Sequence, residues 1–171
     1  ETTVLPESRA SVFFDGLFSE PRHQHAECVA VGPDGHVWCG SENGEVLRIA
    51  PDGSTIEVMG EGGGFTLGLA FDGEETLYFC DLRDATVYRL NLKRRWVERF
   101  AAPGIKVPNY PVVDAARSRL LVSDSHDFAK AGPGVWAYDL GTGEGGLWYD
   151  KPLRFANGMA PALDGHSLYV C

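Results

Sequence analysis

One pattern of residues occurs four times along this chain of 171 residues and limits its fold more than any other feature. Each copy has a pivot residue, a short hydrophobic strand, a turn, and a second strand that ends in small or acidic residues. The copies are HAECVAVGPDGHVWCG from His25, TLGLAFDGEETLYFCD from Thr66, PNYPVVDAARSRLLVSD from Pro108 and ANGMAPALDGHSLYVC from Ala156. The pivot residues of successive copies are separated by 40, 42 and 48 residues. A period of this size is typical of a repeat architecture.

The repeat predicts the blades of a β-propeller, in which each blade is a four-stranded antiparallel sheet of about 40–50 residues. Dipeptides such as Asp34-Gly35 and Asp52-Gly53 favour the tight turns between such strands. We therefore expect an all-β chain with residues 25–171 forming an incomplete propeller. The expected blades cover about 25–65, 66–107 and 108–155, with a truncated fourth at 156–171.

Because closed propellers usually need more than four blades, these three to four blades are expected to be a portion of a larger propeller. The natural polypeptide is then longer than this chain, or two copies associate through their open edges. Residues 1–24 are expected to form an N-terminal arm. Within it, residues 11–14 are either an outer strand of the closing blade or a loosely attached segment. The third repeat has an inserted loop at 125–134, and such loops often lie on a binding face.

Charge and composition exclude some classes of function. The formal net charge of −9 argues against nucleic acid as a partner, since binding phosphates requires a basic surface. No apolar run approaches the roughly 18 residues of a membrane span, and no signal peptide is recognisable at the start. The four cysteines form no CxxC pair, and three of them end second strands as small buried residues. We expect reduced structural thiols and a cytoplasmic location.

The pivot position suggests a metal site. It is occupied by Glu27, Leu67, Asn109 and Asn157. Inner strands of propeller blades run beside the central channel, so these side chains should converge near the axis. A carboxylate and two amide oxygens are ligands that suit Ca²⁺. Mg²⁺ and Mn²⁺ are alternatives, and Zn²⁺ is a weaker one because it prefers nitrogen and sulfur.

Each of these residues also has a simpler interpretation. Asn157-Gly158 is a strong hairpin-turn signal, Asn109 follows a proline that could shape a loop, and Glu27 could be a solvated acid at a strand start. Their shared phase in the repeat favours the metal site. His23 and His25 flank Glu27 and either face the channel or are exposed.

Two aspartates, Asp81 and Asp124, end second strands at a similar phase. The run from Asp124 to Asp127 contains the ingredients of acid–base catalysis, yet charged residues that cap strand ends explain it equally well. Neither Ser123 nor Ser125 lies in a G-x-S-x-G motif, which argues against a serine hydrolase.

With these features, the chain resembles the regucalcin/gluconolactonase family of six-bladed propellers, which has strictosidine-synthase-like and paraoxonase-like relatives. The segments that carry the resemblance are AECVAVGPDGHVWCGSENGEVLRI, LGLAFDGEETLYFCD and LRFANGMAPALDGHSLYVC. The resemblance implies a divalent metal, usually Ca²⁺, held by Glu27 and Asn157, with Asn109 at the metal or the substrate. His126 in the inserted loop is a further candidate for substrate binding.

The activity implied by the resemblance is hydrolysis of a lactone or related ester. The resemblance also implies a catalytic aspartate after Cys171, so a fragment that ends there should be inactive by itself. Sugar-lactone members have an arginine where this chain has Val107, which favours a more apolar lactone. Two alternatives remain at this stage: a non-catalytic propeller that binds a partner, and a condensing enzyme similar to strictosidine synthase.

Overall fold

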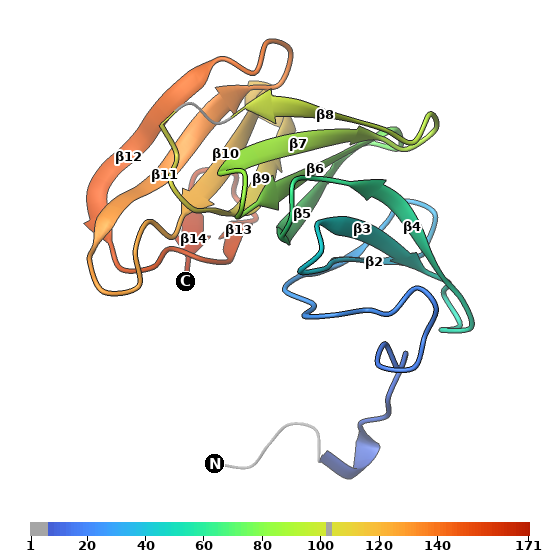
Figure 1. The fold of residues 1–171 in the computed structure, drawn as a ribbon. Coiled ribbons are helices and arrows are strands. Elements are labelled where there is room, and N and C mark those ends of the chain that lie inside the picture. The colour runs from blue at the N-terminus through green and yellow to red at the C-terminus, as the bar shows by residue number, and fades with distance from the viewer. Residues whose placement is uncertain (1–6, 102–103) are drawn as a thin grey trace.

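The computed structural model describes residues 7–101 and 104–171, and its strands form three four-stranded antiparallel sheets and one two-stranded hairpin (Figure 1). The first sheet comprises β1 (Val29–Val31), β2 (Val37–Gly40), β3 (Glu45–Ile49) and β4 (Ile56–Glu61). The second comprises β5 (Thr66–Asp72), β6 (Thr76–Asp81), β7 (Thr86–Asn91) and β8 (Trp96–Ala101). The third comprises β9 (Pro108–Asp114), β10 (Arg119–Asp124), β11 (Gly132–Asp139) and β12 (Gly145–Leu153). The hairpin pairs β13 (Met159–Pro161) with β14 (Leu168–Val170). The expected all-β, partial β-propeller fold is confirmed.

Within each four-stranded sheet the strands are neighbours in chain order, so every sheet is a simple meander. The first strands of consecutive sheets contact one another, β1 with β5, β5 with β9, and β9 with β13. The sheets therefore fan out in an arc with these four strands innermost (Figure 1). This arrangement brings the start of every repeat to one region of the molecule.

The core lies between adjacent sheets and consists of side chains on their facing surfaces. Trp38 of the first sheet packs with Phe79 and Leu90 of the second, and all three are almost fully buried. A second cluster joins the second and third sheets, and a third joins the third sheet to the β13–β14 hairpin. Burial of each large side chain stabilises the fold by about 1.5–3 kcal/mol. Interlocked faces of this kind fix the angle between blades.

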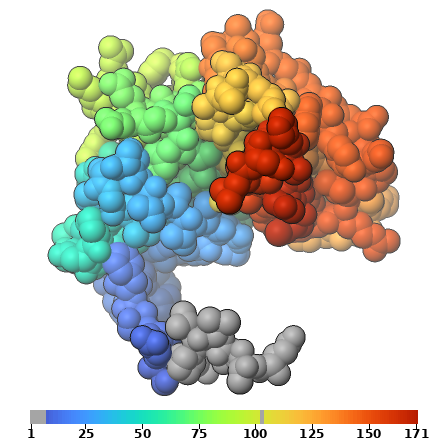
Figure 2. Space-filling model, turned by 180° about the vertical axis from the view of Figure 1, so that it is seen from behind, coloured from blue at the N-terminus to red at the C-terminus, as the bar shows by residue number. Residues whose placement is uncertain are grey.

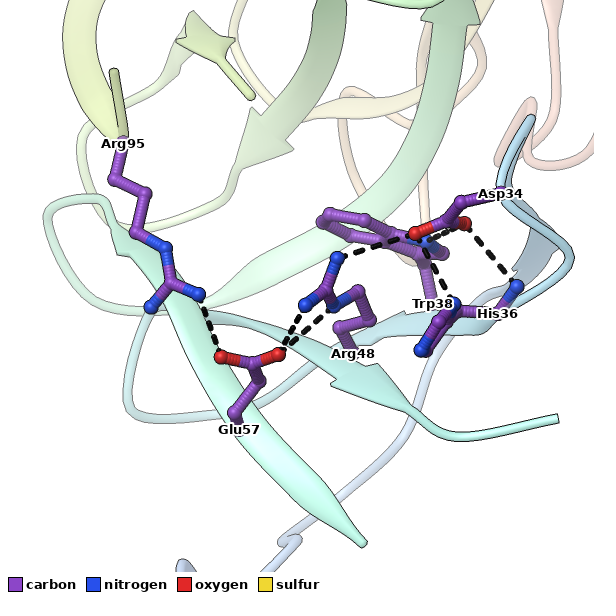
Figure 3. A network of polar contacts seen from close by, with 6 residues as sticks. All are labelled: Asp34, His36, Trp38, Arg48, Glu57 and Arg95. Carbon is purple, nitrogen blue, oxygen red and sulfur yellow. Dashed lines mark hydrogen bonds and ion pairs between the residues drawn. The ribbon is translucent and has the colours of Figure 1, made fainter. Parts of the chain in front are cut away.

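A polar network also links the first two blades (Figure 3). The Arg48 guanidinium binds the Glu57 carboxylate on the neighbouring strand and donates to Asp34 Oδ2 at 3.1 Å. From the β7–β8 turn of the next blade, Arg95 donates to Glu57 Oε2 at 2.6 Å. Glu57 therefore connects two strands of its own sheet with the outer edge of the following sheet.

The Arg–Glu pair recurs in the second blade, where Arg89 of β7 lies opposite Glu98 of β8 and binds it through its guanidinium. Both arginines also lie over an aromatic ring, Arg48 over Trp38 at 5.8 Å and Arg89 over Phe100 at 5.4 Å. The repeat thus extends from the hydrophobic strands to the charged pairs on the outer half of the blade.

Residues 11–14 form no strand in the structure, and Phe14 of this arm packs against the cluster of Cys39, Leu47 and Ile49 in the first sheet. The loop expected at 125–134 ends at residue 131, because residues 132 and 133 pair with residues 153 and 152 as part of β11. The inserted loop is therefore shorter than predicted.

Helical structure in the described residues consists of two 3₁₀ turns, η1 (Glu7–Arg9) and η2 (Ala115–Arg117). Neither the arm nor the blades, as far as the structure describes them, contain a helix with the length and apolar character needed to cross a membrane.

All four cysteines are free thiols, and Cys28, Cys39 and Cys80 are buried. Desolvation raises the pKa of Cys39 to about 12 and that of Cys80 well above its usual value. The expectation of a buried position is wrong for Cys171, which follows β14 and is exposed. The C-terminal segment that includes β13 and β14 lies at the surface, in red in Figure 2. Within the described residues, β14 pairs with β13 only.

Candidate functional site

The four pivot residues line one cavity of about 600 Å³ at the start of the innermost strands. Leu67 and Asn109 are the second residues of β5 and β9, while Glu27 and Asn157 lie two residues before β1 and β13. The structure thus brings Glu27, Asn109 and Asn157 to one cavity from three different repeats. His126, the other candidate from the sequence, lines the same cavity.

The Glu27 carboxylate is held by His25. His25 Nε2 lies 2.8 Å from Glu27 Oε1, and its Nδ1 lies 3.5 Å from Glu42 Oε2. The His25 ring also packs against Phe65, with 5.1 Å between ring centroids. Glu27 is therefore oriented by His25, which is itself held by Glu42 and Phe65. About a third of the Glu27 side chain remains exposed.

Asn109 is almost buried, and its orientation is set by Ser125. Asn109 Nδ2 donates to Ser125 Oγ at 2.9 Å, and Ser125 Oγ donates to the Ala156 carbonyl at 2.7 Å. Because the amide nitrogen is engaged, the carbonyl oxygen of Asn109 is the atom available to a ligand. Sequence reasoning missed this role of Ser125, since it depends on contacts between three distant segments.

Asn157 is half-buried and is positioned through its backbone. Its N–H donates to the Cys171 carbonyl at 2.9 Å, and its carbonyl accepts from Ser123 Oγ at 2.7 Å. Asn157 and Gly158 both lack the positive φ that a two-residue hairpin turn requires. The turn of this hairpin lies instead around Gly165, which has φ +69°. The Asn157 side chain is therefore free for a role other than turn formation.

These donors fit a hard divalent cation. Glu27 supplies a carboxylate, and Asn109 and Asn157 supply amide oxygens, the type of ligand that Ca²⁺ prefers. Among the described residues no group of three His, Cys, Asp or Glu side chains is placed to hold a metal. The all-oxygen donor set does not suit zinc, which favours nitrogen and sulfur.

A second ring of residues lines the same cavity two positions before each pivot. It consists of His25, Phe65, Val107 and Phe155. Three of these four side chains are apolar, and the fourth, His25, already contacts Glu27. The sequence had drawn attention to His25 and Val107. The spacing shared by all four pivots could have identified Phe65 and Phe155 as well.

The backbone around the cavity is strained. Six non-glycine residues of the described chain have positive φ, and three of them, His25, His126 and Phe155, line this cavity with φ of 53°, 57° and 53°. The other three lie in turns that precede strands. Such conformations cost about 1–3 kcal/mol each and cluster at functional sites.

Asp124 and its counterpart Asp81 have a structural role. The Asp124 carboxylate accepts hydrogen bonds from the backbone N–H groups of Lys106, Val107 and His126 at 2.8–3.1 Å. Asp81 accepts from Gly64, Phe65 and Asp84 in the same manner. Both are buried and neither lines the cavity. They fasten the segments that carry the second-ring residues, which favours the capping explanation over acid–base catalysis.

The inserted loop forms one wall of the cavity through His126 to Ala129. Asp127 Oδ1 accepts from the N–H groups of Ala129 and Lys130, and these bonds lower the pKa of Asp127. Lys106 Nζ lies 4.0 Å from Asp127 Oδ2. His126 Nδ1 is buried without a hydrogen-bond partner in the described residues. His23, by contrast, lies outside the cavity, with Nε2 3.2 Å from the Gly40 carbonyl.

Comparison with known proteins places the fold. No protein-family model matches the chain, and no curated protein matches it. Among solved structures, a gluconolactonase from Xanthomonas campestris aligns with a TM-score of 0.70 and 20% identity over 88% of this chain. Hydrazine synthase of Kuenenia stuttgartiensis aligns with a TM-score of 0.67 and 16% identity over 98%, and a chain of a nidogen/laminin complex with 0.62 and 15% over 79%.

This chain spans 55%, 45% and 52% of those three proteins, or about half of each. At such identities the likeness concerns the β-propeller fold, which serves very different proteins. The function therefore has to be argued from the cavity.

Proposed function

We propose that this chain provides the metal- and substrate-binding portion of a divalent-metal-dependent hydrolase of lactones or related esters. The observation that carries the proposal is the convergence of Glu27, Asn109 and Asn157 in one cavity from three repeats. The gluconolactonase among the structural neighbours supports the choice of reaction.

Calcium is the proposed metal, with the Glu27 carboxylate and the oxygens of Asn109 and Asn157 as its ligands. When bound, the ion would act as a Lewis acid on the substrate carbonyl. His25 keeps the Glu27 carboxylate directed, and Ser125 keeps the Asn109 carbonyl oxygen available. The apolar second ring limits access of water to the bound ester. The aspartate that activates water is the one that the family resemblance places after residue 171.

Calcium titration by isothermal calorimetry tests the proposal directly. Glu27→Gln should weaken calcium binding at least about tenfold, because it removes the charge of a direct ligand. Loss of a residue that only supports a ligand already weakens metal binding about 10–100-fold. Glu42→Gln is the matched control, because Glu42 also contacts His25 but lies outside the cavity lining. It should change the affinity less than threefold. Equal affinities of wild type and Glu27→Gln would refute the metal site.

Hydrolysis itself is tested on a gene product that includes the expected aspartate. Lactone hydrolysis should be lost after exhaustive chelation and restored by Ca²⁺. Hydrolysis that survives chelation would contradict the metal mechanism. Calcium binding without any hydrolysis would instead favour a binding propeller, a role for which the nidogen/laminin neighbour is a precedent in fold.

A further inference from the structure

We propose that the substrate of this site carries a bulky apolar substituent, preferably an aryl ring. Phe128, Phe155 and Phe65 select the substrate by packing against this substituent. The inference rests on the proposed lactone or ester hydrolase and specifies its substrate class. The residues that support it belong to the second ring and to the neighbouring inserted loop.

Phe128 is the most unusual member of the cavity lining. Its side chain is 92% exposed, yet its ring stacks on Phe155 with centroids 4.6 Å apart and an angle of 26° between ring planes. The flanking Asp127 accepts two backbone hydrogen bonds from residues 129 and 130, so the loop holds its shape around this ring. A large apolar surface kept in water beside a cavity is typical of a binding surface.

Phe155 and Phe65 continue this apolar surface into the cavity. Phe155 takes the strained φ of 53° two residues before Asn157, and Phe65 occupies the equivalent place before Leu67. Leu82, 36% exposed, and Val107 add to the same lining. Aromatic side chains therefore stand next to the pivot oxygens, and an aryl group on the substrate could pack on them while its carbonyl faces those oxygens.

A polyhydroxylated substrate fits the second ring of this cavity poorly. Each hydroxyl that leaves water needs a hydrogen-bond partner, and an unmet one costs about 1–3 kcal/mol. The second ring offers a single polar side chain, His25, which is already engaged with Glu27. At the rim, Lys106 and Asp127 partly neutralise each other at 4.0 Å. The cavity volume of about 600 Å³ is within the 300–1,000 Å³ range of small-molecule sites, so an aryl lactone is of suitable size.

The test uses a phenyl-substituted δ-lactam, an amide analogue that resists hydrolysis, and a tetrahydroxylated δ-lactam of the same ring size. Binding of both to this chain is measured by calorimetry in the presence of Ca²⁺ and in its absence. The phenyl lactam should bind at least about tenfold more tightly than the hydroxylated one. Equal or reversed affinities, or no binding of the phenyl lactam at millimolar concentration, would overturn the inference.

Two variants assign the preference to the aromatic rings. Phe128→Ala should weaken binding of the phenyl lactam five- to twentyfold and change binding of the hydroxylated lactam less than twofold. Phe18→Ala removes an equally exposed ring, 88% exposed, from the N-terminal arm and should change neither. An unchanged phenyl-lactam affinity in Phe128→Ala would overturn the inference.

The two proposals fail separately. Selective phenyl-lactam binding together with an absence of lactone hydrolysis by the longer gene product would refute the hydrolase and sustain the aromatic site. Calcium-dependent hydrolysis of hydroxylated lactones with no effect of Phe128→Ala would refute the aromatic selection and sustain the hydrolase.

Discussion

Replacing Asp124 with asparagine should strongly destabilise the fold, because its carboxylate accepts three backbone hydrogen bonds and joins residues 106–107 to the segment 124–126. Its Oδ1 accepts from the N–H groups of Val107 and His126, and its Oδ2 accepts from Lys106. Asparagine keeps the shape but replaces one acceptor oxygen with a donor NH₂ group. At least one backbone N–H then faces another donor in a site that is 2% exposed.

The magnitude follows from these contacts. A hydrogen bond to a charged group contributes about 1.5–3 kcal/mol, and a neutral one about 0.5–1.5 kcal/mol. Asp124→Asn loses one bond completely and weakens the other two by about 1–1.5 kcal/mol each, so the free energy of unfolding should fall by about 3–6 kcal/mol. Domains of ordinary stability have about 5–15 kcal/mol in total, so this loss is large.

Urea unfolding followed by circular dichroism measures the effect. Asp81→Asn, with the same geometry in the second blade, should lose a similar amount. Asp139→Asn is the control: Asp139 also accepts three hydrogen bonds, from Gly141 N, Thr142 N and Thr142 Oγ1, but it is exposed and water can replace them. It should lose less than about 1 kcal/mol. A loss below about 1 kcal/mol in Asp124→Asn, with hydrolysis abolished, would refute the structural role and restore the catalytic one.

Two further predictions concern titration and reactivity. The hydrogen bonds from Arg48 lower the pKa of Glu57 below its ordinary 4.5, so the stability from this pair is present above that value and lost as the pH falls through the lowered pKa. The free energies of unfolding of wild type and Glu57→Gln, measured in urea, should differ by at most about 1 kcal/mol at neutral pH, because Glu57 is partly exposed, and should converge in acid; divergence in acid would contradict this account. A thiol reagent with mass-spectrometric readout should modify Cys171 rapidly under native conditions and leave the three buried cysteines intact, and rapid modification of Cys80 would show that the second blade opens.

The fold could be predicted because every blade has the same local sequence pattern of short hydrophobic strands and turns. Turn dipeptides such as Asp34-Gly35 separate short strands at a regular spacing, and Gly35 indeed has φ +78°. The beginning of β11 could not be predicted, because Gly132 and Pro133 are poor strand formers. They join the sheet only through pairing with β12, which is a tertiary contact.

The candidate site was predictable in part. The common phase of Glu27, Asn109 and Asn157 indicated that these residues meet, and their shared cavity agrees in location, while their role as ligands stays a prediction. The contribution of Ser125 was not visible, since its partners lie 16 and 31 residues away. The left-handed backbone conformation of Phe155 could not be predicted either. It is uncommon for a bulky residue, and no local sequence pattern indicates it.

The left-handed conformations of His25, His126 and Phe155 lower the stability of the fold at the same positions where their side chains line the cavity. Glycine adopts positive φ without steric cost, so exchange to glycine would relieve the strain at each position while deleting a side chain that lines the cavity. Laboratory selection for heat resistance alone would therefore tend to erase these three side chains. Their retention in an improved variant would require selection for ligand capture at the same time.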